Sequence, residues 1–191
     1  KIVLGFIGCG KQSGGLQRRF FNLPDAQIVA ASDVYASKLD KFIQSGNQLY
    51  AEKTGQSSYN AMKAYGDYRE LLANKDINAV IIASPDHWHA TMSVHAAEAG
   101  KDVYCEKPLS LTVKEGRAMV DATRKHGRVF QTGSMQRSSP EFTQAVQLVR
   151  SGAIGEIKKI IVSVGGPPKE WDLQAEPTPA GLNWEMWMGP N

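Results

Sequence analysis

Residues 1–15 read KIVLGFIGCGKQSGG, an apolar run followed directly by a cluster of glycines. The run over residues 1–8 is typical of a strand that is buried on both faces. Gly8 permits a tight turn after such a strand, and Gly10 lets the backbone approach a pyrophosphate at the positive end of the next helix. The third glycine of this pattern would fall at position 13, which is Ser13, with a glycine at each of the next two positions. The stretch therefore predicts a strand, a phosphate-binding loop and a helix in succession.

An acidic residue stands where a dinucleotide-binding site needs one. Residues 27–33, QIVAASD, form a second apolar run that ends at Asp33, near the ~20-residue offset expected between the glycine loop and this acid. The Asp33 carboxylate would accept hydrogen bonds from the hydroxyls of the adenosine ribose. A glycine cluster alone is also compatible with a flexible turn, and Asp33 alone with a solvated turn or a helix cap. Because the strand, the loop and the acid occur together, we predict dinucleotide binding.

Apolar runs and helical patterns alternate over the following hundred or so residues. Further strands are expected at 77–84, 101–105 and 128–133, and further helices at 37–54, after residue 85, at 112–126 and from Pro140 onward. Gly100 ends the helix that follows residue 85. Thr112 and Glu115 form a capping-box pair, and Gly127 ends the helix that they begin. The repetition of strand and helix predicts an α/β fold, a doubly wound parallel sheet of the Rossmann type. Ligands of such sheets bind at the carboxyl ends of the strands.

The composition changes after about residue 150. Residues 167–191 contain five of the nine prolines, and residues 171–191 contain three of the four tryptophans. Residues 156–166, EIKKIIVSVGG, predict a longer strand with no crossover helix after it.

This change divides the chain into two predicted parts. We assign residues 1–135 to a Rossmann dinucleotide-binding domain, and residues 136–191 to a linking helix and the first part of an incomplete, truncated α+β C-terminal domain. The predicted strand of the second part would have an open edge. Its tryptophans, Trp171, Trp184 and Trp187, would lack their usual cover.

Charge and composition limit the class of partner. The formal net charge of the 191 residues is +3, which is too mild to indicate a nucleic-acid or membrane surface. No stretch approaches the ~20 apolar residues of a membrane span. We therefore expect a small-molecule partner, and a cytoplasmic protein, with export to the periplasm as the alternative if a signal was removed upstream of Lys1.

The two cysteines, Cys9 and Cys105, do not make a disulfide framework. The strand order of this fold places the fourth strand between the first and the fifth. Cys9 and Cys105 would then stand about two strand spacings apart, at ~10 Å. We therefore predict two free thiols.

Residues 83–90, ASPDHWHA, place polar side chains where a strand meets the next helix, beside the glycine loop. His87 and His89 suggest a metal at first sight, but zinc needs three or four ligands and no third is near in sequence. We expect no metal. The alternative is that both histidines begin a helix and face the cofactor cleft, and Asp86 is equally compatible with a helix cap.

Residues 103–110, VYCEKPLS, end a strand on Glu106, Lys107 and Pro108. At the carboxyl end of the fifth strand a lysine can be partly desolvated, and its cation would favour the alkoxide form of a substrate hydroxyl. Glu106 would orient or neutralise it, while Pro108 fixes the backbone beside it. The alternative is a surface ion pair that contributes under about 1 kcal/mol. The Lys107–Pro108 peptide bond is a candidate for the cis form.

These stretches resemble the N-terminal part of the glucose–fructose oxidoreductase / inositol dehydrogenase / rhizopine-catabolism (Gfo/Idh/MocA) family. The similarity runs through GFIGCGKQSGG, ASDV, ASPDHWHA, AGKDVYCEKPLSLT, GRVFQTGSMQRS and GLNWEMWMGPN, and AGKDVYCEKPLS is its most specific stretch. The resemblance implies an NAD(P)-dependent oxidoreductase with Lys107 as the catalytic and substrate-binding lysine. It also implies that the cofactor is lined by Gly8, Gly10, Lys11, Gln12, Asp33, Ser84, Pro85, His87, His89 and Glu106.

Two departures from the family pattern have consequences. The glycine loop is one residue longer than the simplest pattern, like the version in a branch that includes exported members. The family's catalytic histidine and its nearby aspartate lie further along the chain than Asn191. The sequence therefore resembles about half of an enzyme, which we expect to bind NAD without catalysis, and to form a homo-oligomer at full length.

The leading functional interpretation is a dehydrogenase that passes a hydride between a sugar, polyol or sugar derivative and nicotinamide. We expect NAD rather than NADP, because Asp33 would repel the 2′-phosphate and Val34 supplies no cation to offset that repulsion. Lys38 is the one residue whose cation could reach the 2′-phosphate. One alternative is an NAD-dependent glycosidase that uses transient oxidation. That branch departs from the Glu-Lys-Pro tripeptide. The other alternative is a non-catalytic NAD-binding regulator, against which Lys107 argues.

Overall fold

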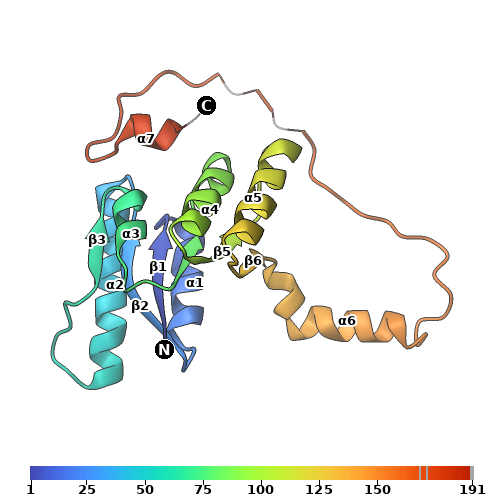
Figure 1. Ribbon diagram of the computed structural model, residues 1–191. Helices are drawn as coiled ribbons and strands as arrows, with labels where there is room; N and C mark the ends of the chain where they lie inside the picture. The colour runs from blue at the N-terminus through green and yellow to red at the C-terminus, as the bar shows by residue number, and fades with distance from the viewer. Residues whose placement is uncertain (168, 171, 190–191) are drawn as a thin grey trace. The chain divides into compact units, whose positions relative to one another are not determined.

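The computed structural model describes residues 1–167, 169–170 and 172–189. In this part of the chain, six strands form one parallel sheet in the order β3-β2-β1-β4-β5-β6 (Figure 1). The strands are β1 Ile2–Ile7, β2 Ala26–Ser32, β3 Lys63–Tyr65, β4 Ala79–Ile82, β5 Asp102–Glu106 and β6 Phe130–Gly133. The prediction of a doubly wound parallel sheet is confirmed, including the position of β4 between β1 and β5.

Helices cover both faces of this sheet (Figure 1). One face packs against α1 (Lys11–Phe21) and α2 (Ala36–Thr54), and the other against α3 (Tyr68–Ala73), α4 (His89–Glu98) and α5 (Val113–Lys125). Because side chains alternate along a strand, Phe6 enters the first layer and Ile7 the second, with exposed fractions of 0% and 1%. Burying a side chain of this size contributes roughly 1.5–3 kcal/mol. Burial on both faces is the reason why the strands are continuous apolar runs.

The helix ends follow the predicted signals. At the start of α5 the Thr112 hydroxyl accepts from the Glu115 amide at 3.2 Å, and the Glu115 carboxylate accepts from the Thr112 amide at 3.0 Å. This confirms the predicted capping box. Gly127 follows α5 with a φ of 60° and Gly100 follows α4 with a φ of 74°, a left-handed conformation that glycine adopts without strain.

Several short elements had no prediction. The edge strand β3 is only three residues long, and α3 begins after Asp67, whose side chain accepts from the Arg69 amide. The helical turn η1 (Asp86–Trp88) precedes α4, and α7 (Trp184–Met188) lies near the end of the described chain. Elements this short contain too few residues to show hydrophobic periodicity.

The chain divides into two compact units. The first comprises Lys1–Gly133 together with residues 179–189, which we call the aromatic segment, and the second is Ser134–Thr178. The aromatic segment packs on the sheet unit, because the Asn183 amide donates to the Val34 carbonyl and the Ala36 amide donates to the Gly181 carbonyl. Our assignment of residues 136–191 to a separate domain stays a prediction.

The expectation for the tryptophans is met only in part. Trp184 is 46% exposed, as expected. Trp187 is half-buried, so the prediction that it lacks cover is wrong. Its ring contacts two others: it stacks on Trp184, with centroids 5.0 Å apart and planes 12° apart, and it lies edge-on to His87, with centroids 5.8 Å apart. Trp171 lies outside the described residues.

The second unit contains η2 (Met135–Ser138) and α6 (Pro140–Arg150), which begins with a proline as predicted. Residues 156–166 form no strand, so this prediction is wrong. A strand requires a neighbour that pairs with its backbone, and none of the described residues provides one. Ile160 and Ile161 are accordingly 77% and 78% exposed.

Both cysteines are free thiols, which confirms the prediction. Both are buried, and burial raises the pKa of Cys9 and raises that of Cys105 to about 12. Separately, no helix among the described residues combines the length and hydropathy needed to cross a membrane.

Both thiols should be nearly unreactive in the folded protein. A thiol reagent reacts with thiolate, and the raised pKa values of Cys9 and Cys105 make thiolate scarce at about pH 8. We expect slow modification by a dithionitrobenzoate reagent in buffer. In denaturant without reductant, both cysteines should react rapidly. Finding no titratable thiol in denaturant would mean that the two cysteines are bonded to each other, contrary to the structure.

Candidate nucleotide-binding site

A cavity of about 460 Å³ lies at the carboxyl ends of β1, β2 and β4. In this sheet the strand order reverses between β1 and β4, which is the place where open α/β sheets bind their ligands. Residues predicted to bind the cofactor form much of its wall: Gly8, Gly10, Lys11, Gln12, Asp33, Ser84 and Pro85. The structure thus brings three separate predicted motifs together at one cavity.

Gly8 occupies a position that only glycine fits. Its φ is +89°, and a Cβ there would lie 2.6 Å from the amide nitrogen of Ser84. The Gly8 amide donates to the Ser32 carbonyl at 2.8 Å. The loops after β1, β2 and β4 therefore meet at this residue.

The start of α1 is open to an anion. Gly10 caps the helix without a side-chain hydrogen bond, no acidic residue lies in the first turn, and a Cβ on Gly10 would meet nothing within 4 Å. The first amides of a helix have no partner within it, and the helix dipole adds positive potential. Lys11 contributes a cation at the same cavity. This end of α1 is therefore suited to a phosphate group.

Ser13 explains how the glycine pattern can depart from its usual form. It is fully buried, and its hydroxyl donates to the carbonyl of Gly8. The side chain thus stabilises the turn while satisfying its own polar group. Cβ atoms on Gly14 or Gly15 would meet nothing within 4 Å, so close packing does not require glycine at either position.

Asp33 is held at the cavity by the backbone. One carboxylate oxygen accepts from the Cys9 amide at 2.6 Å, and the other accepts from the Tyr35 amide at 2.8 Å. Each carboxylate oxygen has a second lone pair. Asp33 can therefore accept hydrogen bonds from ribose hydroxyls while it stabilises the two loops.

The hydroxyl of Ser84 supports occupancy of this cavity by a polar ligand. Its oxygen is buried and has no hydrogen-bond partner among the described residues. An unsatisfied buried hydroxyl costs roughly 1–3 kcal/mol. A ligand with polar groups would satisfy it, so Ser84 and the open amides of α1 together fit a dinucleotide.

Glu106 lies just behind the cavity, where it connects two motifs. It is 4% exposed, and its carboxylate accepts from the side-chain amide of Gln12 at 3.1 Å. Gly133 makes room for it, because a Cβ there would lie 2.8 Å from the Glu106 Oε1 and 2.9 Å from its Cα. Sequence reasoning did not identify Gly133 as part of the site. Its place as the last residue of the last predicted strand was the available signal.

Lys107 does not pair with Glu106, so the expected pairing is wrong. No ion pair between the two occurs in the described part of the chain. Lys107 directly follows the last residue of β5 and is exposed, while Glu106 is buried. The partial desolvation expected of Lys107 is not present in this chain either. The Lys107–Pro108 bond is cis, as predicted.

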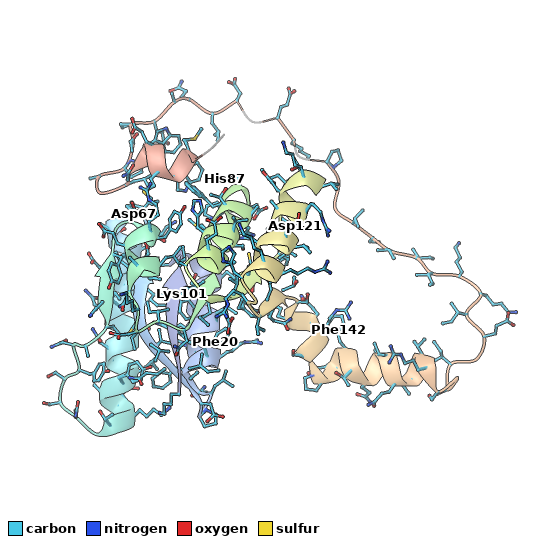
Figure 2. All side chains as sticks on the ribbon, viewed as in Figure 1. Phe20, Asp67, His87, Lys101, Asp121 and Phe142 are labelled. Carbon is cyan, nitrogen blue, oxygen red and sulfur yellow. The ribbon has the colours of Figure 1, made fainter. Side chains whose placement is uncertain are left out.

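The two histidines hold loops together and are not part of the cavity wall. His89 is 1% exposed, with its Nδ1 2.6 Å from the Pro108 carbonyl and its Nε2 2.9 Å from the Ser84 carbonyl. His87 lies beside α7 (Figure 2), and its Nε2 donates to the Trp187 carbonyl at 2.8 Å. Neither histidine is among the residues that line the cavity in the described part of the chain. A direct contact of His87, His89 or Glu106 with a cofactor stays a prediction.

Among the described residues, no group of three or more histidine, cysteine, aspartate or glutamate side chains could hold a metal ion. Because His87 and His89 are each engaged with backbone carbonyls, their proximity in sequence has a structural explanation.

Other wall residues were not predicted. These wall residues come from the α3 and α4 region and from the aromatic segment: Tyr68, Trp88, Met92, Pro179, Leu182, Trp184, Met186 and Trp187. Tyr35 also lines the cavity, with the Lys38 ammonium 5.5 Å from its ring centroid. The cluster of tryptophans was a visible signal, but we assigned it to a different domain.

Comparisons with known proteins agree with this geometry. Residues 2–134 match the family model GFO_IDH_MocA, described as "Oxidoreductase family, NAD-binding Rossmann fold". The inositol 2-dehydrogenase of Salmonella typhimurium is 32% identical over 157 residues, which are 81% of this chain and 43% of that protein. A glycosyl hydrolase family 109 protein of Shewanella pealeana is 32% identical over 159 residues, which are 82% of this chain and 33% of that protein.

A solved structure shows the same fold. The scyllo-inositol dehydrogenase of Lactobacillus casei with bound NAD(H) and scyllo-inositol superposes with a TM-score of 0.67 at 26% identity. The match covers 82% of this chain and 43% of that one. The chain therefore spans less than half the length of these proteins.

The family match extends from β1 to the residue after β6, and so includes the glycine loop, Asp33 and the Glu-Lys-Pro turn. The chain belongs to the Gfo/Idh/MocA oxidoreductase family, and residues 2–134 are its NAD-binding Rossmann domain.

Proposed function

We propose that this chain is the cofactor-binding half of an NAD-dependent dehydrogenase that acts on a sugar, a polyol or a sugar derivative. The observation that carries the proposal is the cavity where β1, β2 and β4 end, with the open amides of α1, the anchored Asp33 carboxylate and the unpaired Ser84 hydroxyl around it. The similarity to an inositol 2-dehydrogenase, and to a structure that contains NAD(H) and scyllo-inositol, supports the substrate class.

The residues of this chain would divide the work between binding and chemistry. The amides of α1 and the Lys11 ammonium would neutralise the pyrophosphate, and Asp33 would hold the ribose hydroxyls. NAD, when bound, supplies the hydride acceptor. The ammonium of Lys107 would stabilise negative charge on the substrate oxygen as its proton leaves.

Lys107 needs surroundings that this chain alone does not give it. It is exposed in the structure, and a cation surrounded by water stabilises an alkoxide weakly, because water screens the interaction. We infer that the rest of a longer protein covers Lys107 and supplies the residue that accepts the proton.

The preference for NAD over NADP is also part of the proposal. The Asp33 carboxylate is fixed by two backbone amides, so it cannot easily turn away from a 2′-phosphate at the same ribose. Lys38 is the nearby cation, and its ammonium lies over the ring of Tyr35. The Asp33 carboxylate and a 2′-phosphate are both negative, and their repulsion is strong where water is partly excluded.

A glycosidase that uses transient oxidation is the second candidate, because a glycosyl hydrolase family 109 protein is among the relatives. The Glu-Lys-Pro tripeptide at 106–108 favours net oxidation. Product analysis of the full-length protein separates the two. Reduced cofactor released with an oxidised sugar indicates a dehydrogenase, and free aglycone without reduced cofactor indicates a glycosidase.

The 191-residue chain should bind NAD and should not turn over sugars or polyols. The residues proposed to hold the pyrophosphate and the ribose hydroxyls lie before residue 110, whereas the proton-accepting residue is expected elsewhere. Calorimetric titration with NAD and a reduced-cofactor assay over a panel of sugars and inositols would test both statements. Absence of NAD binding would refute the cofactor site, and robust turnover would refute our placement of the base.

Wild-type protein should bind NAD at least about tenfold more tightly than NADP, because the fixed Asp33 carboxylate opposes the 2′-phosphate. In Asp33→Asn the charge is lost while one side-chain acceptor is kept. This variant should bind NADP more tightly than the wild type does, so the difference between its affinities for NAD and NADP should be smaller. Titrations with both cofactors measure the ratio, and equal affinities in the wild type would show that Asp33 does not face the 2′ position.

In the full-length enzyme, Lys107→Met should lower kcat by about 10²–10⁴-fold with little effect on NAD affinity. Methionine keeps much of the side-chain volume and removes the charge. Lys114→Met is the matched control, since Lys114 is an exposed lysine of α5 and does not line the cavity. Steady-state kinetics and NAD titration measure both effects. Near-normal turnover of Lys107→Met would identify Lys107 as a structural residue at the end of β5.

A further inference from the structure

We propose that the aromatic segment, residues 179–189, closes the adenosine half of the nucleotide site, and that Trp187 and Met186 contact the adenine base. The inference rests on the proposed function, because it assigns a part of the same cavity to one part of the cofactor. It adds a binding element that lies outside residues 2–134, the range that matches the NAD-binding family model.

One end of the segment is joined to the loop that follows Asp33. Leu182 forms an antiparallel bridge with Tyr35. The Asn183 amide donates to the Val34 carbonyl at 2.9 Å, and the Ala36 amide donates to the Gly181 carbonyl at 3.0 Å. These bonds place the segment against the loop that directly follows Asp33, the residue that is expected to hold the adenosine ribose.

The other end is joined to the region that follows β4. The carbonyl of Trp187 accepts from His87 Nε2 at 2.8 Å and from Trp88 Nε1 at 3.2 Å. Gly189 packs against the same indole, because a Cβ there would lie 2.6 Å from a ring carbon of Trp88. The segment therefore spans the cavity from the loop after β2 to the turn after β4.

The cavity wall at this side is apolar and aromatic. Tyr68, Trp88 and Met92 line it from the sheet unit, and Leu182, Met186 and Trp187 line it from the segment. A purine base gains affinity from stacking on aromatic rings and from apolar contact, whereas a pyrophosphate needs donors and cations. The wall therefore suits adenine, while the glycine loop and Lys11 suit the phosphates.

The nicotinamide half would lie elsewhere. Lys107, which is expected to act beside nicotinamide, does not line the cavity. In the part of the chain that the structure describes, the polar contacts of the segment with the sheet unit go to Val34, Ala36, His87 and Trp88, apart from those of Met188. These partners follow β2 and β4, not β5. We therefore assign the segment to the adenosine half alone.

The test compares nucleotides that contain different parts of the cofactor. In the 191-residue chain, Trp187→Ala should lower the affinity for NAD and for ADP-ribose by about 5- to 10-fold. This is the range expected for loss of an aromatic contact with a base. Binding of nicotinamide mononucleotide should change less than about twofold. Trp187→Phe keeps an aromatic ring and should restore most of the affinity. Glu185→Gln is the control, because Glu185 is an exposed residue of the same helix that does not line the cavity.

A second measurement uses the wild-type chain and does not depend on how a variant folds. The amides of Ala36 and Asn183 make the backbone bonds that join the segment to the Tyr35 loop. Their protection from hydrogen exchange should rise on addition of ADP-ribose and should not rise on addition of nicotinamide mononucleotide.

The possible results separate this inference from the proposed function. Unchanged ADP-ribose affinity in Trp187→Ala, equal weakening of all three nucleotides, or equal protection by both fragments would overturn the assignment to adenosine while the NAD site stands. A wild-type chain that binds none of the nucleotides would overturn both proposals.

Discussion

The backbone after β4 passes so close to Gly8 that a Cβ there would lie 2.6 Å from the Ser84 nitrogen and 2.7 Å from the Ala83 carbonyl oxygen. The whole candidate site depends on this approach. It places the end of β1 against the end of β4, and the same glycine donates to the carbonyl of Ser32 at the end of β2. Because the three strand ends meet here, the start of α1 and the Ser84 hydroxyl lie at one cavity.

Around that contact, buried polar side chains connect the loops to each other. Gln12 joins the glycine loop to Glu106, and His89 lies between the carbonyls of Ser84 and Pro108. A buried polar group that loses its partner costs more than the bond itself contributed. The loops of the site are therefore coupled, and a change in the turn at Lys107 would alter the structure of the glycine loop. This coupling gives Glu106 and His89 a structural role even where they touch no ligand.

The sequence alone determined the class of the sheet, the place of β4 between β1 and β5 and the location of the phosphate-binding loop. Long apolar runs such as 1–8 and 77–84 identify strands because a doubly covered sheet requires apolar side chains on both faces. The capping box at Thr112 and the glycine at 127 marked α5 because helix ends have unpaired backbone groups that particular residues satisfy. By contrast, β3 has only three residues, which is too short for any pattern. The strand predicted at 156–166 was wrong because an apolar run becomes a strand only where a neighbour pairs with it.

For the site, residue types and their spacing were enough to name Gly8, Gly10 and Asp33, because the chemistry of a dinucleotide requires those groups after those strands. Ser84 was named only through the resemblance to the family. Only the tertiary structure decided which side chains face the cavity. Glu106, the last residue of β5, is buried and accepts a hydrogen bond from Gln12, while Lys107, the next residue along the chain, is exposed. The tertiary structure alone also showed that the aromatic segment packs against the loop after β2. That contact joins Leu182 to Tyr35, residues nearly 150 positions apart, and a sequence pattern carries local periodicity but no information on which distant backbone groups pair.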